Sequence, residues 1–342
     1  MRTFTFKGLF LTAVFMLLGC LSIQAADDDL ITKQITIKLD KAGTLPNKIA
    51  SSRWYDITNL KIVGEINGTD LRMIRNMAGF SGSGNLSVLD LSEAKIVGGG
   101  DDYYNHYYTS NDEIGSYAFF GCSVLTSLNL PASITTIGDY AFYGCRGLTS
   151  LNLPASITSI GDCAFRYCSG LTSLNLPASI LWIDKYTFYG CSGLTTLTLP
   201  AGIDWIGDYA FYGCSGLTSI NLPASILSIG DYAFSYCRGL TSIYVYAEKV
   251  PRISRYSFED CGARSCTLYV PKGTYDNYRL SVFGYFENIV EFDATGIDKT
   301  TTSTDAKEVS RYSVNGQRLV GPTKGLNIVK YSDGSVKKVA VE

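Results

Sequence analysis

The sequence predicts a solenoid, a chain wound into stacked coils with one short β-strand in each coil. Three observations indicate it: cysteine recurs at a constant step of 23 residues, a strand-like pattern of leucines recurs with the same step, and proline follows most of these strands. The cysteines of the series are Cys122, Cys145, Cys168, Cys191, Cys214 and Cys237. One coil cannot bury its own apolar face, but stacked coils bury a continuous core.

Composition excludes several functions. With 46% hydrophobic residues among 342, the chain can bury a core, and its formal net charge of −2 does not suit nucleic acid, whose phosphates need a basic surface. His106 is the only histidine, so a His-paired nucleophile and most zinc chemistry lack their partner residues. We therefore expect no enzymatic activity, no cofactor and no metal site.

Residues 1–25 combine a basic start with a short apolar run, which is typical of an export signal. Two processing routes are open: cleavage near Ala25 or Ala26, or lipidation of Cys20, because Leu17-Leu18-Gly19-Cys20 resembles a bacterial lipobox. No other stretch is long and apolar enough to span a bilayer. We expect a secreted or outer-surface protein, with or without a lipid anchor.

Each predicted strand follows the pattern Leu-x-x-Leu-x-Leu, and proline ends the first five strands because it has no N–H for a continuing ladder. The apolar positions are Leu125/Leu128/Leu130, Leu148/Leu151/Leu153, Leu171/Leu174/Leu176, Leu194/Leu197/Leu199, Leu217/Ile220/Leu222 and Leu240/Ile243/Val245. The prolines are Pro131, Pro154, Pro177, Pro200 and Pro223.

The second half of each coil holds a paired Ile-x-x-Ile, a Gly-Asp pair and a Tyr-Ala-Phe run that leads to the cysteine. The aspartates lie where a short helix or 3-10 turn would begin, and we expect them to cap that turn, because aspartate is a favoured N-cap. They are Asp139, Asp162, Asp208 and Asp231. The phenylalanines predict an aromatic spine: Phe119, Phe142, Phe165, Phe188, Phe211, Phe234 and Phe258.

The unit at 137–156, Ile-Gly-Asp-Tyr-Ala-Phe-Tyr-Gly-Cys-Arg-Gly-Leu-Thr-Ser-Leu-Asn-Leu-Pro-Ala-Ser, resembles the BspA-type leucine-rich repeat of bacterial surface proteins. The resemblance implies a leucine-rich repeat solenoid of about seven coils, built of mostly short parallel β-strands with short helical or 3-10 turns. Residues 269–273 with 286–290 are similar to the C-terminal cap of such arrays, and residues 60–97 resemble an N-terminal cap.

The expected organisation has six parts. Residues 1–25 form the signal peptide, 26–113 an N-terminal cap with one atypical repeat, 114–260 the 23-residue repeats and 261–294 the C-terminal cap. A polar linker spans 295–310, and 311–342 alternate as the short strands of a small β-module. The module looks like the C-terminal sorting domains of type IX secretion cargo, and a purely structural module fits the pattern equally.

The repeated cysteines predict free thiols. In neighbouring coils they would lie roughly 5 Å apart, but their Cβ vectors run parallel, which disfavours disulfides. We expect buried thiols that fill small apolar gaps. Cys261 and Cys266 are the better disulfide candidates, because the repeat breaks there and Gly262 allows a turn.

Residues that break the repeat are candidate binding residues. Between the paired isoleucines most units carry Thr or Ser, which implies outward side chains, but the central units carry Leu181 with Trp182, Asp204 with Trp205, and Leu227. We expect the tryptophans to stand side by side, one coil apart. An exposed apolar cluster marks a binding surface more often than single residues do, and burial under a cap or the C-terminal module is the alternative.

A tyrosine-rich loop at 101–108 is the second candidate. Tyr103, Tyr104, Tyr107 and Tyr108 supply contact area at small entropic cost, which suits recognition of protein or sugar. A loop packed on the first coil is the alternative.

The family resemblance implies a non-enzymatic protein-binding or adhesion module directed to host extracellular matrix or other cells, although fold-level analogy names no partner. The other hypothesis is a carbohydrate-binding accessory protein at the cell surface, motivated by outward aromatic residues beside Asn and Thr.

Overall fold

The computed structural model describes residues 30–294, 308–313, 318–322, 324–331 and 336–341. The predicted export signal, Cys20 and residues 295–307 of the predicted linker lie outside the described residues. The chain divides into two units, Met1–Phe292 and Asp293–Glu342, and each is described by itself.

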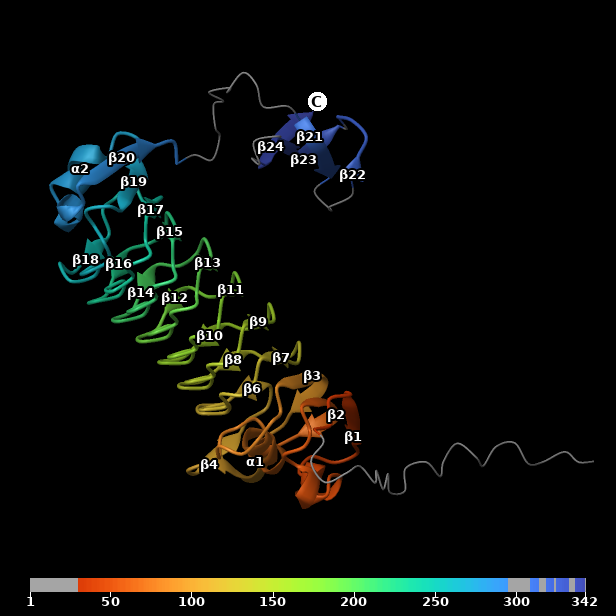
Figure 1. The fold of residues 1–342 in the computed structure, drawn as a ribbon. Coiled ribbons are helices and arrows are strands. Elements are labelled where there is room, and N and C mark those ends of the chain that lie inside the picture. The colour runs from red at the N-terminus through yellow and green to blue at the C-terminus, as the bar shows by residue number, and fades with distance from the viewer. Residues whose placement is uncertain (1–29, 295–307, 314–317, 323, 332–335, 342) are drawn as a thin grey trace, which may run out of the picture. The chain divides into compact units, whose positions relative to one another are not determined.

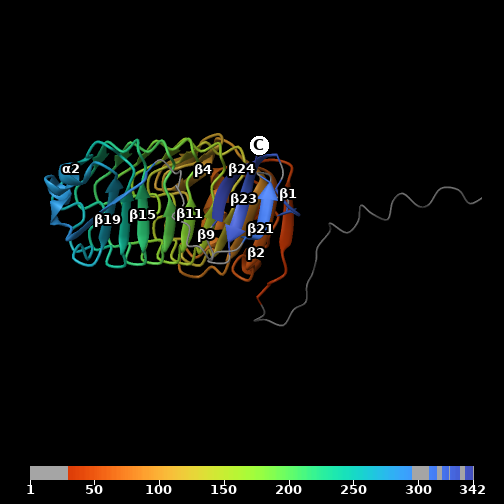
Figure 2. The ribbon, with the colours of Figure 1, turned by 90° about the horizontal axis from the view of Figure 1, so that it is seen from above.

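The first unit is a solenoid whose front face is a stack of parallel strands, as Figures 1 and 2 show. Each coil adds one strand in register with the strand before it, so that Leu128, Leu151 and Leu174 lie in one row. A seven-stranded sheet contains β1 (Ile35–Leu39), β2 (Asn59–Ile66), β3 (Val88–Ile96), β7 (Ser127–Asn129), β9 (Ser150–Asn152), β11 (Ser173–Asn175) and β13 (Thr196–Thr198). A four-stranded sheet contains β15 (Ser219–Leu222), β17 (Ser242–Val245), β19 (Thr267–Pro271) and β20 (Asn288–Phe292).

The back face carries a second stack of two-residue strands, built from the Ile-x-x-Ile segments. One sheet contains β6 (Glu113–Ile114), β8 (Thr136–Ile137) and β10 (Ser159–Ile160). The other contains β12 (Trp182–Ile183), β14 (Trp205–Ile206), β16 (Ser228–Ile229) and β18 (Arg252–Ile253). Within each strand the isoleucine points inward and its neighbour points outward. This alternation fixes which residues of the back face reach solvent.

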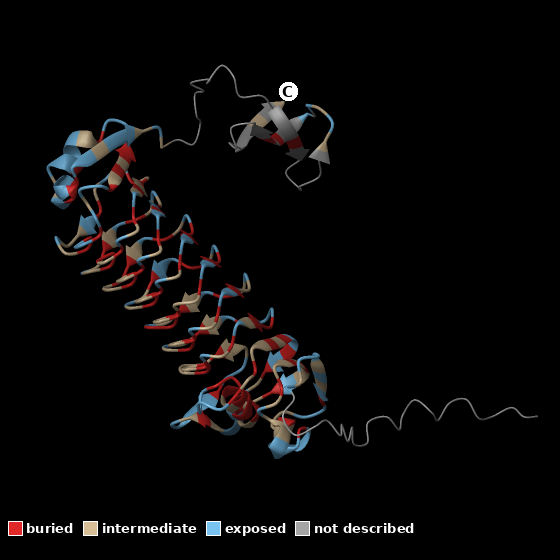
Figure 3. Cartoon of the chain, viewed as in Figure 1, coloured by how far each residue is buried: buried red, intermediate tan, exposed pale blue. Residues whose placement is uncertain are grey.

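The core lies between the two faces, and Figure 3 shows buried residues along the inner side of each coil. The predicted aromatic spine is present: Phe119 and Phe142 stack at 5.4 Å between ring centroids, and the pairs that follow stack at 5.0–5.5 Å. The repeated cysteines are buried free thiols. Cys261 and Cys266 are also buried free thiols in this structure, so the predicted disulfide is not formed in it.

Tight turns connect the back strands to the cysteines. The predicted short turns are present as i→i+3 hydrogen-bonded turns, such as the bond from Tyr143 N–H to Tyr140 O at 3.1 Å, and a residue with positive φ, such as Tyr140 at 55°, keeps each turn from continuing as a regular helix. The expectation that the aspartates accept N–H groups of the turn that follows them in their own coil is wrong. Asp139 Oδ1 instead accepts the backbone N–H of Asp162 in the next coil at 2.9 Å, and Asp162 Oδ1 accepts that of Lys185 at 3.0 Å.

Strands outside the recognisable repeats extend the stack beyond the expected seven or so coils. At the N-terminal end β1, β2 and β3 continue the front sheet, beside η1 (Leu45–Asn47), η2 (Ser51–Arg53) and α1 (Gly68–Met77). A hairpin of β4 (Gly99–Tyr104) and β5 (Tyr107–Thr109) packs on α1. At the C-terminal end α2 (Tyr275–Arg279) and η3 (Val282–Tyr285) lie between β19 and β20 along the chain.

The second unit contains an antiparallel sheet of four strands in the order β22-β21-β23-β24. These strands are β21 (Glu308–Ser313), β22 (Arg318–Leu319), β23 (Gly325–Tyr331) and β24 (Val336–Val341). Among the residues that the structure describes in either unit, no helix has the length and apolar character needed to cross a membrane.

Candidate functional site

The structure brings the two predicted tryptophans together on the back face. Trp182 on β12 pairs in register with Trp205 on β14, and the isoleucines that follow them point into the core. Trp182 is 39% exposed and Trp205 is half-buried. The repeat explains this placement, because the same position holds Ser159 and Ser228 in the flanking coils, where a small polar side chain faces solvent.

Leu181, Asp204 and Leu227 form a second outward row beside the tryptophans. The backbone N–H of Asp204 donates to Leu181 O at 2.9 Å, and that of Leu227 donates to Asp204 O at 2.8 Å, so the three residues occupy consecutive coils. Leu181 and Leu227 are 46% and 66% exposed, and Asp204 is exposed between them. We call these three residues with Trp182 and Trp205 the Trp patch.

Among the described residues, neither tryptophan ring stacks on another aromatic ring, so the ring faces make no aromatic contact. The indole N–H of Trp182 donates to Asp184 Oδ2 at 3.2 Å, which fixes that ring by its edge. Burial raises the pKa of the Asp184 carboxyl, with a smaller push from Asp162, although the indole N–H opposes the rise. The arrangement is a flat apolar surface rimmed by carboxylates.

The tyrosine-rich loop contains one buried, one half-buried and two exposed tyrosines. Tyr103 is 4% exposed and its hydroxyl donates to Ser116 O at 2.8 Å; burial raises its pKa to about 12. The Tyr104 ring stacks on Tyr117 at 5.2 Å. These two residues therefore attach the hairpin to the first coil. Tyr107 and Tyr108 are 40% and 55% exposed and are accessible to a ligand.

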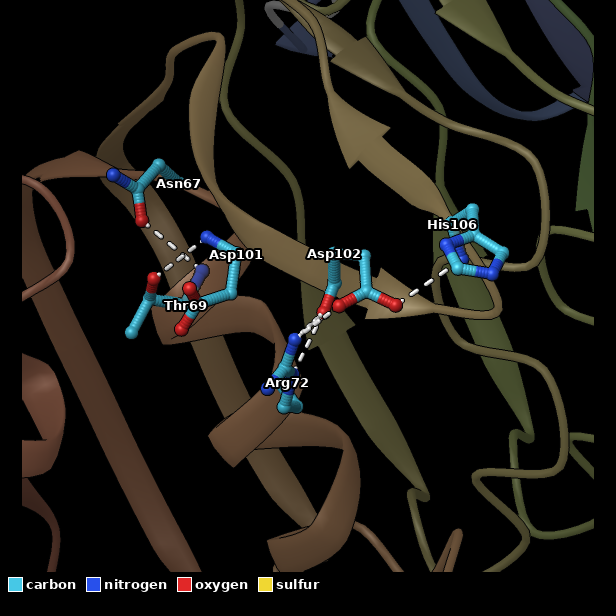
Figure 4. A network of polar contacts seen from close by, with 6 residues as sticks. All are labelled: Asn67, Thr69, Arg72, Asp101, Asp102 and His106. Atoms are coloured by element: carbon cyan, nitrogen blue, oxygen red, sulfur yellow. Dashed lines mark hydrogen bonds and ion pairs between the residues drawn. The ribbon is translucent and has the colours of Figure 1, made fainter.

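A polar network holds this hairpin on α1, as Figure 4 shows. The Arg72 guanidinium donates to the Asp102 carboxylate and backbone carbonyl, and Asp102 Oδ2 accepts the backbone N–H of His106 at 3.1 Å. That N–H and the nearby Arg72 lower the pKa of Asp102. The Asp101 N–H donates to Thr69 Oγ1 at 2.9 Å. The network positions the loop, and the hydrogen bond from His106 comes from its backbone N–H.

Sequence reasoning missed an aromatic edge along the turns of the coils. Two columns of half-buried rings run side by side, and neighbouring coils stack them at 4.7–5.1 Å. The columns are Tyr117, Tyr140, Tyr186, Tyr209, Tyr232 and Tyr256, and Phe120, Tyr143, Tyr189 and Tyr212. Stacking leaves only ring edges for solvent. The repeated tyrosines in the sequence were the signal for it.

One coil interrupts the aromatic edge with Cys163 and Arg166 in place of two rings. The Arg166 guanidinium carbon lies 4.4 Å from the centre of the Tyr189 ring and 5.3 Å from that of Tyr186. Cys163 is buried, at 2% exposure. The cation therefore fills the space of one missing ring. The Tyr167 ring lies edge-on between Tyr143 and Tyr189, at 5.5 and 5.4 Å, in the space of the other, so the edge stays continuous.

The front face is polar and uncharged along the repeats. The threonine hydroxyls are occupied, because Thr149 and Thr172 donate to backbone carbonyls of the preceding coil at 3.3 and 3.2 Å. The side-chain amides of Asn129, Asn152 and Asn175 are exposed in register and have no hydrogen-bond partner among the described residues.

No group of three or more His, Cys, Asp or Glu side chains in the described part of the chain is arranged to hold a metal ion. The repeated thiols are unsuited to nucleophilic chemistry as well, since burial raises the pKa of Cys122 and of Cys191 to about 12.

Stacked coils of parallel strands with leucine, isoleucine and phenylalanine in the core define a leucine-rich repeat solenoid. The chain belongs to the BspA-type leucine-rich repeat family, whose model matches in six copies over residues 107–204, 159–278 and 204–304. No functionally curated protein matches the sequence.

Solved structures of bacterial leucine-rich repeat proteins are similar to the chain. A leucine-rich repeat protein from Bacteroides ovatus is 22% identical, with a TM-score of 0.44, covering 70% of this chain and 62% of that one. A leucine-rich cell surface protein from Faecalibacterium prausnitzii is 24% identical, with a TM-score of 0.37, covering 49% and 61%. A leucine-rich repeat protein of T. pallidum is 26% identical, with a TM-score of 0.39, covering 50% and 76%. The matches thus span less than two thirds of the first two proteins.

Proposed function

We propose that the protein is exported, displayed at the outer cell surface and binds a protein partner through the Trp patch. The observation that carries the proposal is the in-register pair of Trp182 and Trp205 on the back face, flanked by exposed leucines. Tryptophan is enriched among residues that dominate binding energy, and an apolar cluster rimmed by polar groups is typical of an interface. Membership of a family of surface proteins makes adhesion to host extracellular matrix or to other cells the expected role.

The binding test uses immobilised full chain and, in solution, fibronectin, laminin, fibrinogen and collagen. We expect at least one of them to bind, and the double variant Trp182→Ser/Trp205→Ser to weaken that binding at least about tenfold, a difference of about 1.4 kcal/mol. Serine is the residue of the flanking coils, so the variant keeps the fold. Leu280→Ala is the control, because Leu280 is 86% exposed but lies at the C-terminal end of the solenoid. Unchanged binding by the double variant would remove the Trp patch from the proposal.

Export is tested separately in the producing cell. Intact-mass measurement of the mature protein distinguishes cleavage near Ala25 from a lipidated Cys20, and a Cys20→Ala variant abolishes only the lipidated form. Recovery of the uncleaved chain inside the cell would contradict export. Truncation after Phe292 asks whether the C-terminal module serves sorting: a cargo signal predicts retention inside the cell, whereas a structural module predicts normal display.

Carbohydrate binding is the second candidate, favoured by the front face. The exposed amides of Asn129, Asn152 and Asn175 are uncharged and have no hydrogen-bond partner among the described residues. Further along the front face, on β17 and β19, the Tyr244 and Tyr269 rings stack at 4.3 Å with Phe292 edge-on. Amides and aromatic rings together suit uncharged sugars. A glycan array probed with wild type and Asn152→Ala tests it, and an array without reproducible signals would discard it.

A further inference from the structure

The Trp patch has a free carboxylate at its centre. Asp204 lies between Leu181 and Leu227 in one outward row and precedes Trp205, which pairs with Trp182. Among the described residues no ion pair or side-chain hydrogen bond involves the Asp204 carboxylate. The equivalent position is Thr135 and Thr158 in the first repeats, so the charge is specific to this coil.

The surroundings of the patch add negative charge. The row on the other side of the tryptophans contains Asp139, Asp162, Asp208 and Asp231. The same row also contains two bases: Lys185, whose Nζ lies 2.9 Å from Asp208 Oδ2, and Arg255, which follows Ile253 as Asp231 follows its pairing partner Ile229. A third base, Arg252, is exposed at the C-terminal end of the patch, where its backbone N–H donates to Leu227 O at 2.9 Å, so the aspartates still outnumber the bases. A surface with this charge attracts a cationic partner and repels an anionic one.

The Trp patch combines apolar area, the faces of two tryptophan rings and a carboxylate. This combination suits an arginine side chain. A cation is attracted to the face of a tryptophan, and arginine does this best because its guanidinium is planar and weakly hydrated. The same guanidinium can present two N–H groups to a carboxylate. The exposed leucines on both sides of Asp204 offer contacts to apolar residues that flank such an arginine.

Building on the proposed function, we propose that the Trp patch accepts an arginine side chain of its protein partner, with apolar residues on both sides of that arginine. The guanidinium stacks on Trp182 and Trp205 and pairs with Asp204, and the flanking residues contact Leu181 and Leu227. The partner is therefore a protein segment that is basic at its centre and apolar around it.

The test measures tryptophan fluorescence of a Trp54→Phe chain, in which only Trp182 and Trp205 report. The probes are acetyl-Val-Leu-Arg-Leu-Val-amide and the same peptide with citrulline, which keeps the shape of arginine without its charge. We expect the arginine peptide to bind at least about fivefold more tightly, within the range of a cation over tryptophan with a paired carboxylate. Asp204→Asn abolishes that preference, whereas Glu248→Gln, which changes an exposed carboxylate after β17, leaves it intact.

Two results overturn the inference: equal binding of both peptides, or an arginine preference that Asp204→Asn does not change. A lysine peptide that binds as tightly as the arginine peptide would overturn the choice of arginine. The proposed function is judged independently, by whether Trp182→Ser/Trp205→Ser weakens binding of a matrix protein. If that variant loses binding while the peptides show no preference, the patch is an apolar interface and only the arginine inference fails.

Discussion

The thiol of Cys168 donates a hydrogen bond to the backbone carbonyl oxygen of Phe142 in the preceding coil, across 3.0 Å. The same bond recurs from Cys145 to Phe119 at 3.1 Å and from Cys191 to Phe165 at 3.0 Å. Each of these carbonyls also accepts the cysteine N–H of its own coil. The thiol column therefore connects neighbouring coils by hydrogen bonds, in addition to filling gaps in the core.

Replacing Cys168 with alanine tests this column. The change removes a buried donor and leaves a small void, so we expect the free energy of unfolding to fall by about 1–2 kcal/mol. Chemical denaturation followed by circular dichroism measures it. Ser192→Ala, on an exposed residue of a neighbouring turn, is the control and should leave the midpoint in place. Equal midpoints for Cys168→Ala and wild type would show that the column contributes nothing.

Alkaline pH should unfold the protein through the same thiols. Burial raises the pKa of Cys122 and Cys191 from the ordinary 9.0 to about 12. The unfolded chain therefore loses these protons at lower pH than the folded chain does. Their contribution to stability is complete below about pH 9 and is lost as pH rises toward about 12. Denaturation midpoints measured from pH 7 to pH 11 should stay level and then decline above pH 9. A midpoint that holds steady to pH 11 would contradict the account.

Arg75 should join the N-terminal end to the repeats. Its side chain is buried, it donates to Tyr117 O at 2.8 Å, and its guanidinium lies 4.3 and 4.6 Å from the Phe80 and Tyr104 ring centres. Burial lowers its pKa. Arg75→Ala should cost about 3 kcal/mol through lost packing, whereas Arg75→Met, which restores volume without charge, should cost about 1 kcal/mol. Amide hydrogen exchange in α1 measures the loss of stability in both variants. Equal protection of the α1 amides in Arg75→Ala and Arg75→Met would contradict this packing role.

The interrupted aromatic edge predicts coupling between two positions. Cys163→Tyr alone should destabilise the fold, because the Arg166 guanidinium occupies the space that the new ring needs, and adding Arg166→Ala should remove this clash and let the new ring stack between Tyr140 and Tyr186. A double-mutant cycle in chemical denaturation should give a favourable coupling of about 1–2 kcal/mol. If the effects of the two single variants on the free energy of unfolding simply add, the arginine does not replace the missing ring.

The repeat itself could be predicted because each coil carries the same leucines, isoleucines, phenylalanine and cysteine. The same regularity placed Trp182 beside Trp205, since only the coil step was needed. The turn geometry could not be predicted, because tyrosine seldom adopts positive φ and the Gly-Asp-Tyr sequence is equally typical of a capped helix. The pairing of Asp139 with the next coil follows from that geometry.

The ends of the solenoid were harder to predict for a different reason. β1 and β2 lack the leucine pattern, and only the sheet register shows that Ile35, Leu60 and Leu89 continue the row of inward residues. The burial of Arg75 also depends on tertiary contacts with Phe80 and Tyr104, since a charged residue in an amphipathic helix ordinarily faces solvent.

Binding of the full chain and of Trp182→Ser/Trp205→Ser to one matrix protein, measured side by side by surface plasmon resonance, tests the central claim most directly. The account predicts that the double variant keeps the denaturation midpoint of wild type and loses at least about tenfold in affinity, mostly through faster dissociation. An affinity equal to that of wild type, with the fold intact, would contradict it.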